Sequence, residues 1–235
     1  MALLKTNDAA AIRTRFQREL VDDVRIDFYT ASRAGLIVPG QECEYCATVQ
    51  QLLEEVAALD PRLKLHIHDA TTDADGPQRE PVHRIPATIV SRDGRSGVRF
   101  YGIPSGFEFA VLIEDLIAVS RNESGLAPET KARLKGLSQD VHVQVFVTPT
   151  CPHCPGASHV AHMMALESAR ITADVVEATE FPALADKYGV YGVPKIVLND
   201  TLSFEGAQPE SWFLEQVMTA GRGTAAVAAG TSGEE

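Results

Sequence analysis

All four cysteines of this 235-residue chain occur in two Cys-x-x-Cys motifs, so no cysteine is left over. In each half of the sequence, a proline preceded by an apolar residue follows the first cysteine at a spacing of 43 residues. The motifs are Cys43-Glu44-Tyr45-Cys46 and Cys151-Pro152-His153-Cys154, and the dipeptides are Ile85-Pro86 and Val193-Pro194. Two cysteines three positions apart at the start of a helix lie on one face, close enough to form a disulfide. The pattern therefore predicts two copies of one unit, each with a redox-active pair of thiols.

The segments around the two motifs repeat in the same order. An alternating segment before each motif predicts a strand, at 24–29 and at 141–147, and apolar residues at helical spacing follow each motif. Asp93-Gly94 and Asn199-Asp200 each separate two alternating segments, as in a β-hairpin. Each half is thus expected to have the order β-α-β-α-β-β-α, and a short helix is expected within the connection at 121–140.

This repeat predicts an α/β chain of two tandem units, each with a central four-stranded mixed sheet flanked by helices. We expect an N-terminal unit at 1–124, a C-terminal unit at 125–221 and a flexible tail at 222–235. The tail is rich in Gly, Ala, Thr and Ser, which bury little surface.

Composition excludes several classes of function. A net charge of −11 argues against a nucleic-acid partner, because phosphate binding needs basic patches. No apolar run approaches the roughly 18 residues of a membrane span. The N-terminal segment 1–16 reads as a helix, not as a signal peptide, so a cytoplasmic location is expected. Structural disulfides are rare in that compartment, which favours catalytic or metal-binding cysteines.

The first cysteine of each motif is the expected nucleophile. Cys43 and Cys151 would face the N-termini of their helices, whose N–H groups and positive dipole end stabilise a thiolate. Cys46 and Cys154 would then be the resolving thiols that release the substrate from a mixed disulfide. The expected activity is thiol–disulfide exchange on protein disulfides, without a cofactor or a metal.

Metal binding is the alternative chemistry for four cysteines. Two such motifs can supply the four thiolates of a structural zinc site, which would make the chain a non-catalytic interaction protein. Their separation of 108 residues is far beyond usual ligand spacing. A local variant would combine Cys151 and Cys154 with His159 and His162. A helix beginning at Cys154 would splay these groups, and both histidines are interpreted as residues of the polar helix face.

With the motifs and prolines in place, the chain resembles the two-domain protein disulfide oxidoreductases, glutaredoxin-like proteins of thermophilic archaea and bacteria. The resemblance runs from about residue 20 to 220 and is most specific at VRFYGIPSGFEFAVLIEDLIAVS (98–120) and VFVTPTCPHCP (145–155). It implies two fused thioredoxin folds with disulfide reductase, oxidase or isomerase activity. It also implies electron supply from a thioredoxin-reductase-like flavoenzyme. A peroxiredoxin is a further expected partner, and a dedicated electron carrier to a thiol peroxidase is the second alternative function.

Further residues are expected to contact the substrate. An extended peptide could pair with the backbone of Ile85 and Val193 next to cis-prolines Pro86 and Pro194. Tyr45 and His153 lie inside the motifs and complete the expected substrate-binding set.

Two features depart from the family or from its relatives. The first unit has extra residues at 31–42, and His153 stands where a tyrosine is common. Thioredoxins usually keep a buried carboxylate six residues before the first cysteine, where this chain has Ile37 and Val145. Proton transfer at the second site would therefore need water, His153 or a more distant acid.

Overall fold

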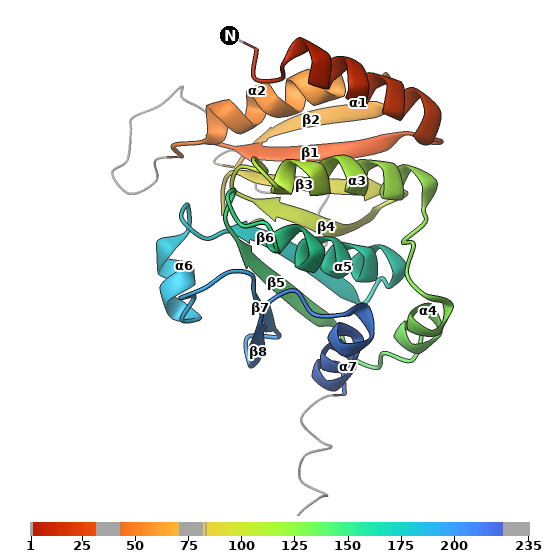
Figure 1. Ribbon diagram of the computed structural model, residues 1–235, viewed down its shortest axis with the longest axis vertical. Coiled ribbons are helices and arrows are strands. Elements are labelled where there is room, and N and C mark those ends of the chain that lie inside the picture. The colour runs from red at the N-terminus through yellow and green to blue at the C-terminus, as the bar shows by residue number, and fades with distance from the viewer. Residues whose placement is uncertain (1, 32–42, 71–81, 83, 223–235) are drawn as a thin grey trace, which may run out of the picture.

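The computed structural model describes residues 2–31, 43–70, 82 and 84–222, and these residues form a layered α/β structure (Figure 1). The first half contains α1 (Thr6–Glu19), β1 (Val24–Thr30), α2 (Cys46–Ala57), β2 (Leu63–Asp69), β3 (Ala87–Arg92), β4 (Arg95–Tyr101) and α3 (Glu108–Arg121). The second half contains α4 (Pro128–Leu134), β5 (Val141–Val147), α5 (Cys154–Glu167), β6 (Ile171–Glu177), α6 (Pro182–Lys187), β7 (Lys195–Leu198), β8 (Leu202–Glu205) and α7 (Glu210–Ala220). The α/β class and the short helix expected within 121–140 are confirmed.

The described strands form one mixed sheet in the order β2-β1-β3-β4-β6-β5-β7-β8. Each half contributes four neighbouring strands with the same internal order, which is the repeat expected from the sequence. The halves meet where β4 pairs in parallel with β6, from Val98 opposite Ala173 to Tyr101 opposite Val176. This pairing satisfies two strand edges that would otherwise expose backbone N–H and C=O groups.

Both predicted hairpins turn at residues with positive φ. Asp93 and Gly94 have φ values of 52° and 77° between β3 and β4, and Asn199 and Asp200 have 48° and 59° between β7 and β8. Two consecutive residues with positive φ match the right-handed twist of the strands that the turn joins. Asn, Asp and Gly tolerate this conformation better than other residues, which is why the sequence signal was specific.

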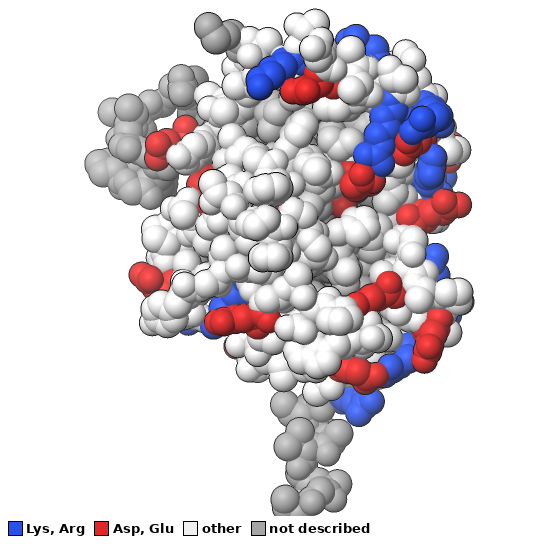
Figure 2. Space-filling view, viewed as in Figure 1, with Lys and Arg blue, Asp and Glu red and all other residues white. Residues whose placement is uncertain are grey.

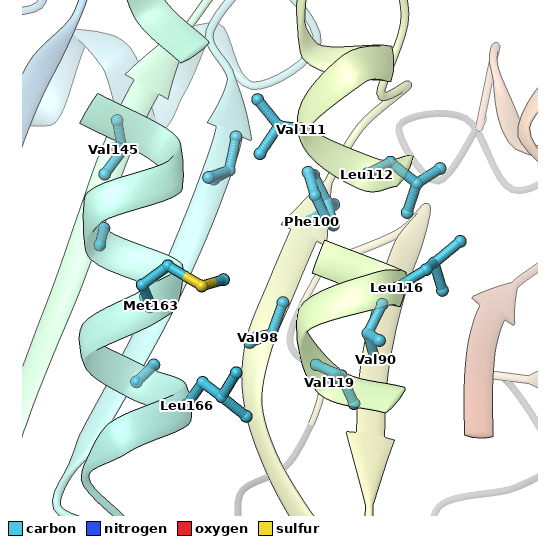
Figure 3. Close-up of a cluster of buried hydrophobic side chains, with 14 of the residues drawn as sticks. Val90, Val98, Phe100, Val111, Leu112, Leu116, Val119, Val145, Met163 and Leu166 are labelled. Carbon is cyan, nitrogen blue, oxygen red and sulfur yellow. The ribbon is translucent and has the colours of Figure 1, made fainter. Parts of the chain in front are cut away.

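One hydrophobic core extends through both halves. Helices α3 and α5 lie side by side on one face of the sheet (Figure 1). Figure 3 shows that Val98 and Phe100 of β4 point toward Leu112 of α3 and Met163 of α5. These side chains are buried and belong to a single cluster. Burial of apolar surface at this junction therefore stabilises the two halves together.

Charged side chains on the face seen in Figure 2 lie mostly at its margins, with acidic and basic groups intermixed. Arg15 of α1, for example, pairs with Glu19 at 3.1 Å and with Glu114 of α3 at 2.5 Å. Exposed pairs of this kind contribute little stability each, about 0–1 kcal/mol. Within the described part of the chain, no helix combines the length and apolar character needed to cross a bilayer.

The interpretation of His162 as a polar-face residue is wrong. His162 is completely buried, and its Nδ1 lies 2.6 Å from Asp115 Oδ2. Helix α5 packs against α3 on its side as well as on the strands beneath it, so a second face is covered. Helical spacing alone identified the apolar face, but the partner in α3 could not be read from it. His159 is half-buried.

Candidate active site

The first Cys-x-x-Cys motif lies at the start of α2. Cys43 and Cys46 form a disulfide with their Cα atoms 5.4 Å apart. Cys46 begins the helix and is buried at 6% exposure, whereas Cys43 is half-buried. Glu44 and Tyr45, between them, are exposed. The preceding residues 32–42, which include most of the extra loop and Ile37, lie outside the described residues.

The second motif has the same arrangement at the start of α5. Cys151 and Cys154 form a disulfide with a Cα separation of 5.5 Å. Cys151 is 8% exposed, and Cys154 is completely buried. The backbone N–H of Cys154 donates to Cys151 Sγ at 3.1 Å, and His153 is exposed at the helix N-cap. A donor at this sulfur stabilises a thiolate there.

The two predicted prolines follow cis peptide bonds, at Ile85-Pro86 and Val193-Pro194, as expected. The carbonyl oxygen of Val193 lies 3.6 Å from Cys151 Sγ, so this dipeptide is adjacent to the second disulfide. Each proline carbonyl accepts a hydrogen bond at 2.9 Å from a glycine that ends the hairpin, Gly102 for Pro86 and Gly206 for Pro194. These two equivalent hydrogen bonds are part of the structural repeat.

Glu108, the first residue of α3, is a site residue that the sequence reasoning missed. Its side chain is buried, and it lines a small cavity with Gly102, Ile103 and Glu177. Ser158 lies beside its carboxyl group, although no described group has good hydrogen-bonding geometry to either oxygen. Burial raises the pKa of Glu108 to about 7, and Ser158 and His162 oppose the rise.

The position of Glu108 relates it to the second disulfide. Ser158 follows Cys154 by one helical turn, so the two side chains share a face of α5. Glu108 thus packs from the first half against the α5 face that carries the buried cysteine. The signal available in the sequence was a single glutamate within an otherwise apolar segment at 107–113. Its role depends on a helix packing that local periodicity does not specify.

A loop of the first half borders the second site. Gly106 has a φ of +61°, and a Cβ atom there would lie 2.1 Å from the carbonyl oxygen of Pro149. The N–H of Phe107 donates to that same oxygen at 3.1 Å. Pro149 precedes Cys151 by two residues, so Phe107, 49% exposed, adjoins the segment that leads into the second motif.

A loop of the second half reaches toward the first site. Glu180 accepts a hydrogen bond at 2.6 Å from the N–H of Ile103, which follows β4. Burial raises the pKa of Glu180 to about 7, the Ile103 N–H opposes the rise, and the charges of Glu177 and Glu44 add to it. Glu44 belongs to the first motif, so each redox site has a neighbour from the opposite half.

The cysteines of the two motifs pair locally and are not gathered into one group. Among the described residues, no set of three or more His, Cys, Asp or Glu side chains is arranged to hold a metal ion. The chemistry that this arrangement supports is reversible disulfide exchange at two separate positions.

Comparison with known proteins gives matches over most of the chain. A family model described as a thioredoxin domain matches residues 141–219. The crystal structure of a protein disulfide oxidoreductase from Aeropyrum pernix is 34% identical and superimposes with a TM-score of 0.80. That match covers 93% of this chain and 94% of the other.

Other matches are more distant. The NTD_N/C domain of alkylhydroperoxide reductase AhpF from Enterococcus faecalis is 19% identical, with a TM-score of 0.81 over 91% of this chain and 99% of that domain, and it shares the fold. An alkyl hydroperoxide reductase polypeptide from Staphylococcus aureus is 28% identical over 156 residues, or 64% of this chain. An NADH dehydrogenase from Bacillus subtilis is 25% identical over 149 residues, or 63% of this chain. The chain spans 27% of the length of each of these two curated relatives.

Proposed function

Because this chain belongs to the protein disulfide oxidoreductases and is a thiol–disulfide oxidoreductase with two tandem thioredoxin folds, we propose roles for its individual cysteines. Cys43 and Cys151 attack the substrate disulfide, and Cys46 and Cys154 resolve the mixed disulfides. The observation that carries this assignment is the unequal burial within each pair. The first cysteine is the more accessible one, and the second is enclosed at the start of its helix.

At the second site the reductive reaction proceeds in two exchanges. The Cys151 thiolate attacks one sulfur of a substrate disulfide, and the other substrate sulfur leaves with the bonding electrons. Cys154 then loses its proton and attacks Cys151 Sγ, which closes the enzyme disulfide and expels the second substrate sulfur. Two electrons pass to the substrate, and its two thiolates take up protons. The reverse sequence oxidises a substrate dithiol.

Glu108 is the group that accepts the proton of Cys154 in this scheme. Cys154 has no exposed surface, so bulk water is a poor base for it. A carboxyl group with a pKa of about 7 is balanced between accepting and releasing a proton at neutral pH. Glu108 thus takes the place of the carboxylate that thioredoxins usually keep six residues before the first cysteine, where this chain has Val145.

Substrate binding uses the surface around each first cysteine. An extended segment of the substrate pairs with the backbone of Val193 at the second site and of Ile85 at the first, beside Pro194 and Pro86. Tyr45 and His153 are exposed within the motifs and contact the substrate next to its disulfide.

Two kinds of partner follow as proposals. A thioredoxin-reductase-like flavoenzyme supplies electrons, and protein disulfides, including that of a peroxiredoxin, receive them. The resemblance to part of the Staphylococcus aureus alkyl hydroperoxide reductase favours a peroxide-reducing partner as the second candidate function.

We place the activity in the cytoplasm, where the reducing thiol pool keeps such pairs available. Cell fractionation with antibody detection tests this location.

The test of the cysteine roles is insulin-disulfide reduction and reactivation of scrambled ribonuclease by the wild type, Cys43→Ser, Cys151→Ser and the double variant. Each single variant should retain the activity of the other site, and the double variant should have none. Single variants at Cys46 and Cys154 should instead accumulate mixed disulfides with the substrate. A double variant with wild-type turnover would contradict the proposal.

A further inference from the structure

Asp115 and His162 form a fully buried pair between the two halves of the molecule. Both side chains are at 0% exposure, and Asp115 Oδ2 lies 2.6 Å from His162 Nδ1. The second ring nitrogen, Nε2, lies 3.1 Å from the carbonyl oxygen of Arg99 in β4. The Phe100 and His162 rings pack in an edge-to-face arrangement with their centroids 4.8 Å apart.

This geometry limits the protonation states that the pair can adopt. A carbonyl oxygen can only accept a hydrogen bond, and so can an ionised carboxylate. With Asp115 ionised, both ring nitrogens carry protons to satisfy the two contacts, and His162 is an imidazolium. The other arrangement that satisfies both contacts is a protonated Asp115 that donates to a neutral ring. Burial lowers the pKa of His162, but the charge and hydrogen bond of Asp115 outweigh it and raise the pKa overall. Burial raises the pKa of Asp115, and the charge and hydrogen bond of His162 oppose that rise. The inference concerns the ionised form of the pair, a cation held by an anion.

The cation lies in the same row of polar side chains between α3 and α5 as the second redox site, and we call this row the polar seam. Cys154, Ser158 and His162 are four residues apart along α5 and share one face. Glu108 and Asp115 are two turns apart on α3 and face them. The charge of His162 lowers the pKa of Glu108, against the effect of burial.

Other charged groups also act on the polar seam, and the charge of Asp115 itself raises the pKa of Glu108. His159 of α5 and Glu114 of α3 contribute to the environment of Asp115. From α4, Lys131 pairs with Glu167 at the far end of α5, at 3.5 Å. The strands beneath α5 present Val98, Phe100, Ala173 and Val175 there, and β6 adds Glu177, a buried carboxylate that lines the same cavity as Glu108. His162 is thus the cation best placed to act on Glu108.

We propose that His162, held as a cation by Asp115 and by the Arg99 carbonyl, is a positioning residue that sets the pH range in which the second site resolves its mixed disulfide. The inference rests on the proposed role of Glu108 as the base for Cys154. Without the cation, Glu108 keeps its proton to higher pH, and Cys154 transfers its proton more slowly at neutral pH.

The test uses the full chain with Cys43→Ser and Cys46→Ser, so that the second site acts alone. The rate of mixed-disulfide resolution is measured from pH 5 to 10 with a fluorescent peptide disulfide. His162→Gln should shift the midpoint upward, with a rate about five-fold lower at pH 7 that recovers by about pH 9. Asp115→Asn should shift the midpoint upward by less, because the charge of Asp115 itself raises the pKa of Glu108. Unchanged midpoints in both variants would show that the pair has a structural role alone and would overturn the proposal.

Asp27 and His68 offer a matched control in the first half. This pair also has a carboxylate oxygen 2.6 Å from a ring nitrogen, and Asp27 is buried. Asp27→Asn should leave the pH profile of the second site unchanged. An equal shift in that variant would mean that any buried Asp–His pair acts through stability, which also overturns the proposal.

Glu108→Gln separates this inference from the proposed function. If the titration near pH 7 survives in Glu108→Gln, the role of Glu108 is wrong. If His162→Gln shifts the profile even when combined with Glu108→Gln, the cation acts on another group and the tuning proposal is wrong. A ¹⁵N NMR spectrum of the wild type needs no variant and should show both His162 ring nitrogens protonated at pH 8, whereas a neutral ring would refute the inference.

Discussion

The carboxyl group of Glu108 should set the pH dependence of the second redox site. Its pKa is raised to about 7 chiefly by burial, so it is half ionised at neutral pH. Because the ionised form accepts the Cys154 proton, second-site activity should rise as the pH passes through about 7 and level off above it. Glu108→Gln should remove this step and slow resolution at pH 7 by up to about 100-fold. Stopped-flow rates across the pH range measure this, with exposed Glu123→Gln as the control. An unaltered profile in Glu108→Gln would contradict it.

The residues between the cysteines should give the two sites different redox potentials. At the second site, His153 and the N–H that bonds to Cys151 Sγ favour a thiolate and hence the reduced form. At the first site, the charge of Glu44 opposes a thiolate at Cys43; Glu42 lies outside the described residues. A pKa difference of one unit corresponds to about 1.4 kcal/mol, or about 30 mV for this two-electron couple.

We therefore expect the second site to be the more oxidising one. Redox titration of the two double-serine variants against glutathione measures both potentials. Glu44→Gln should raise the potential of the first site and narrow the difference. Equal potentials, or a lower potential at Cys151 and Cys154, would show that the prediction is wrong.

Phe107 and Tyr191 are exposed aromatic residues on two segments that adjoin the second site. The N–H of Phe107 donates a hydrogen bond to the carbonyl oxygen of Pro149. Tyr191, 98% exposed, precedes Val193 by two residues. Rings at this position favour substrates with apolar side chains beside the disulfide. Phe107→Ser should raise KM for such a peptide about 3- to 10-fold at the second site, because the peptide loses its apolar contact with one ring. The KM at the first site should be unchanged. Val21→Ser, an exposed apolar position in the α1–β1 connection, is the control, and an equal effect there would remove the basis for this role.

At the scale of elements, Gly106 fixes how closely the loop between β4 and α3 approaches the second motif. Gly106 combines positive φ with a close approach to the Pro149 carbonyl, whereas Gly125 has a φ of +67° and open space around its Cβ position. Gly125→Ala should cost about 1 kcal/mol of unfolding free energy from backbone strain alone. Gly106→Ala should cost about 1–3 kcal/mol more and displace the second motif, which lowers its exchange rate. Urea unfolding and single-site kinetics measure both effects. Equal losses of stability in the two variants would exclude the steric explanation.

At the scale of the whole molecule, the shared sheet and core should make the halves unfold together. The predicted division at 124/125 falls between α3 and α4, yet β4 pairs with β6 and α3 packs on α5 across it. Trp212, the single tryptophan, lies in α7 and reports the second half by fluorescence. Hydrogen exchange of β1 amides reports the first half. Both probes should give one midpoint in urea. Val175→Ala at the junction should lower the free energy of unfolding by about 2 kcal/mol, as measured by either probe. Two separated transitions would show that the units are independent.

The sequence by itself determined the local features of this protein. Cysteine spacing, the repeated prolines and the Asp-Gly and Asn-Asp turns act over a few residues, so each could be assigned without knowledge of distant contacts. The repeat then predicted the fold class and the position of both disulfides at helix starts. Only the tertiary structure decided what crosses between the halves: the β4–β6 pairing, Glu108 beside α5, and the buried pair of Asp115 and His162. In these cases the partners lie tens of residues apart in the chain. Helical periodicity shows that a face is apolar, but a buried charge is stabilised by one specific partner, and the partner is chosen by how the helices pack.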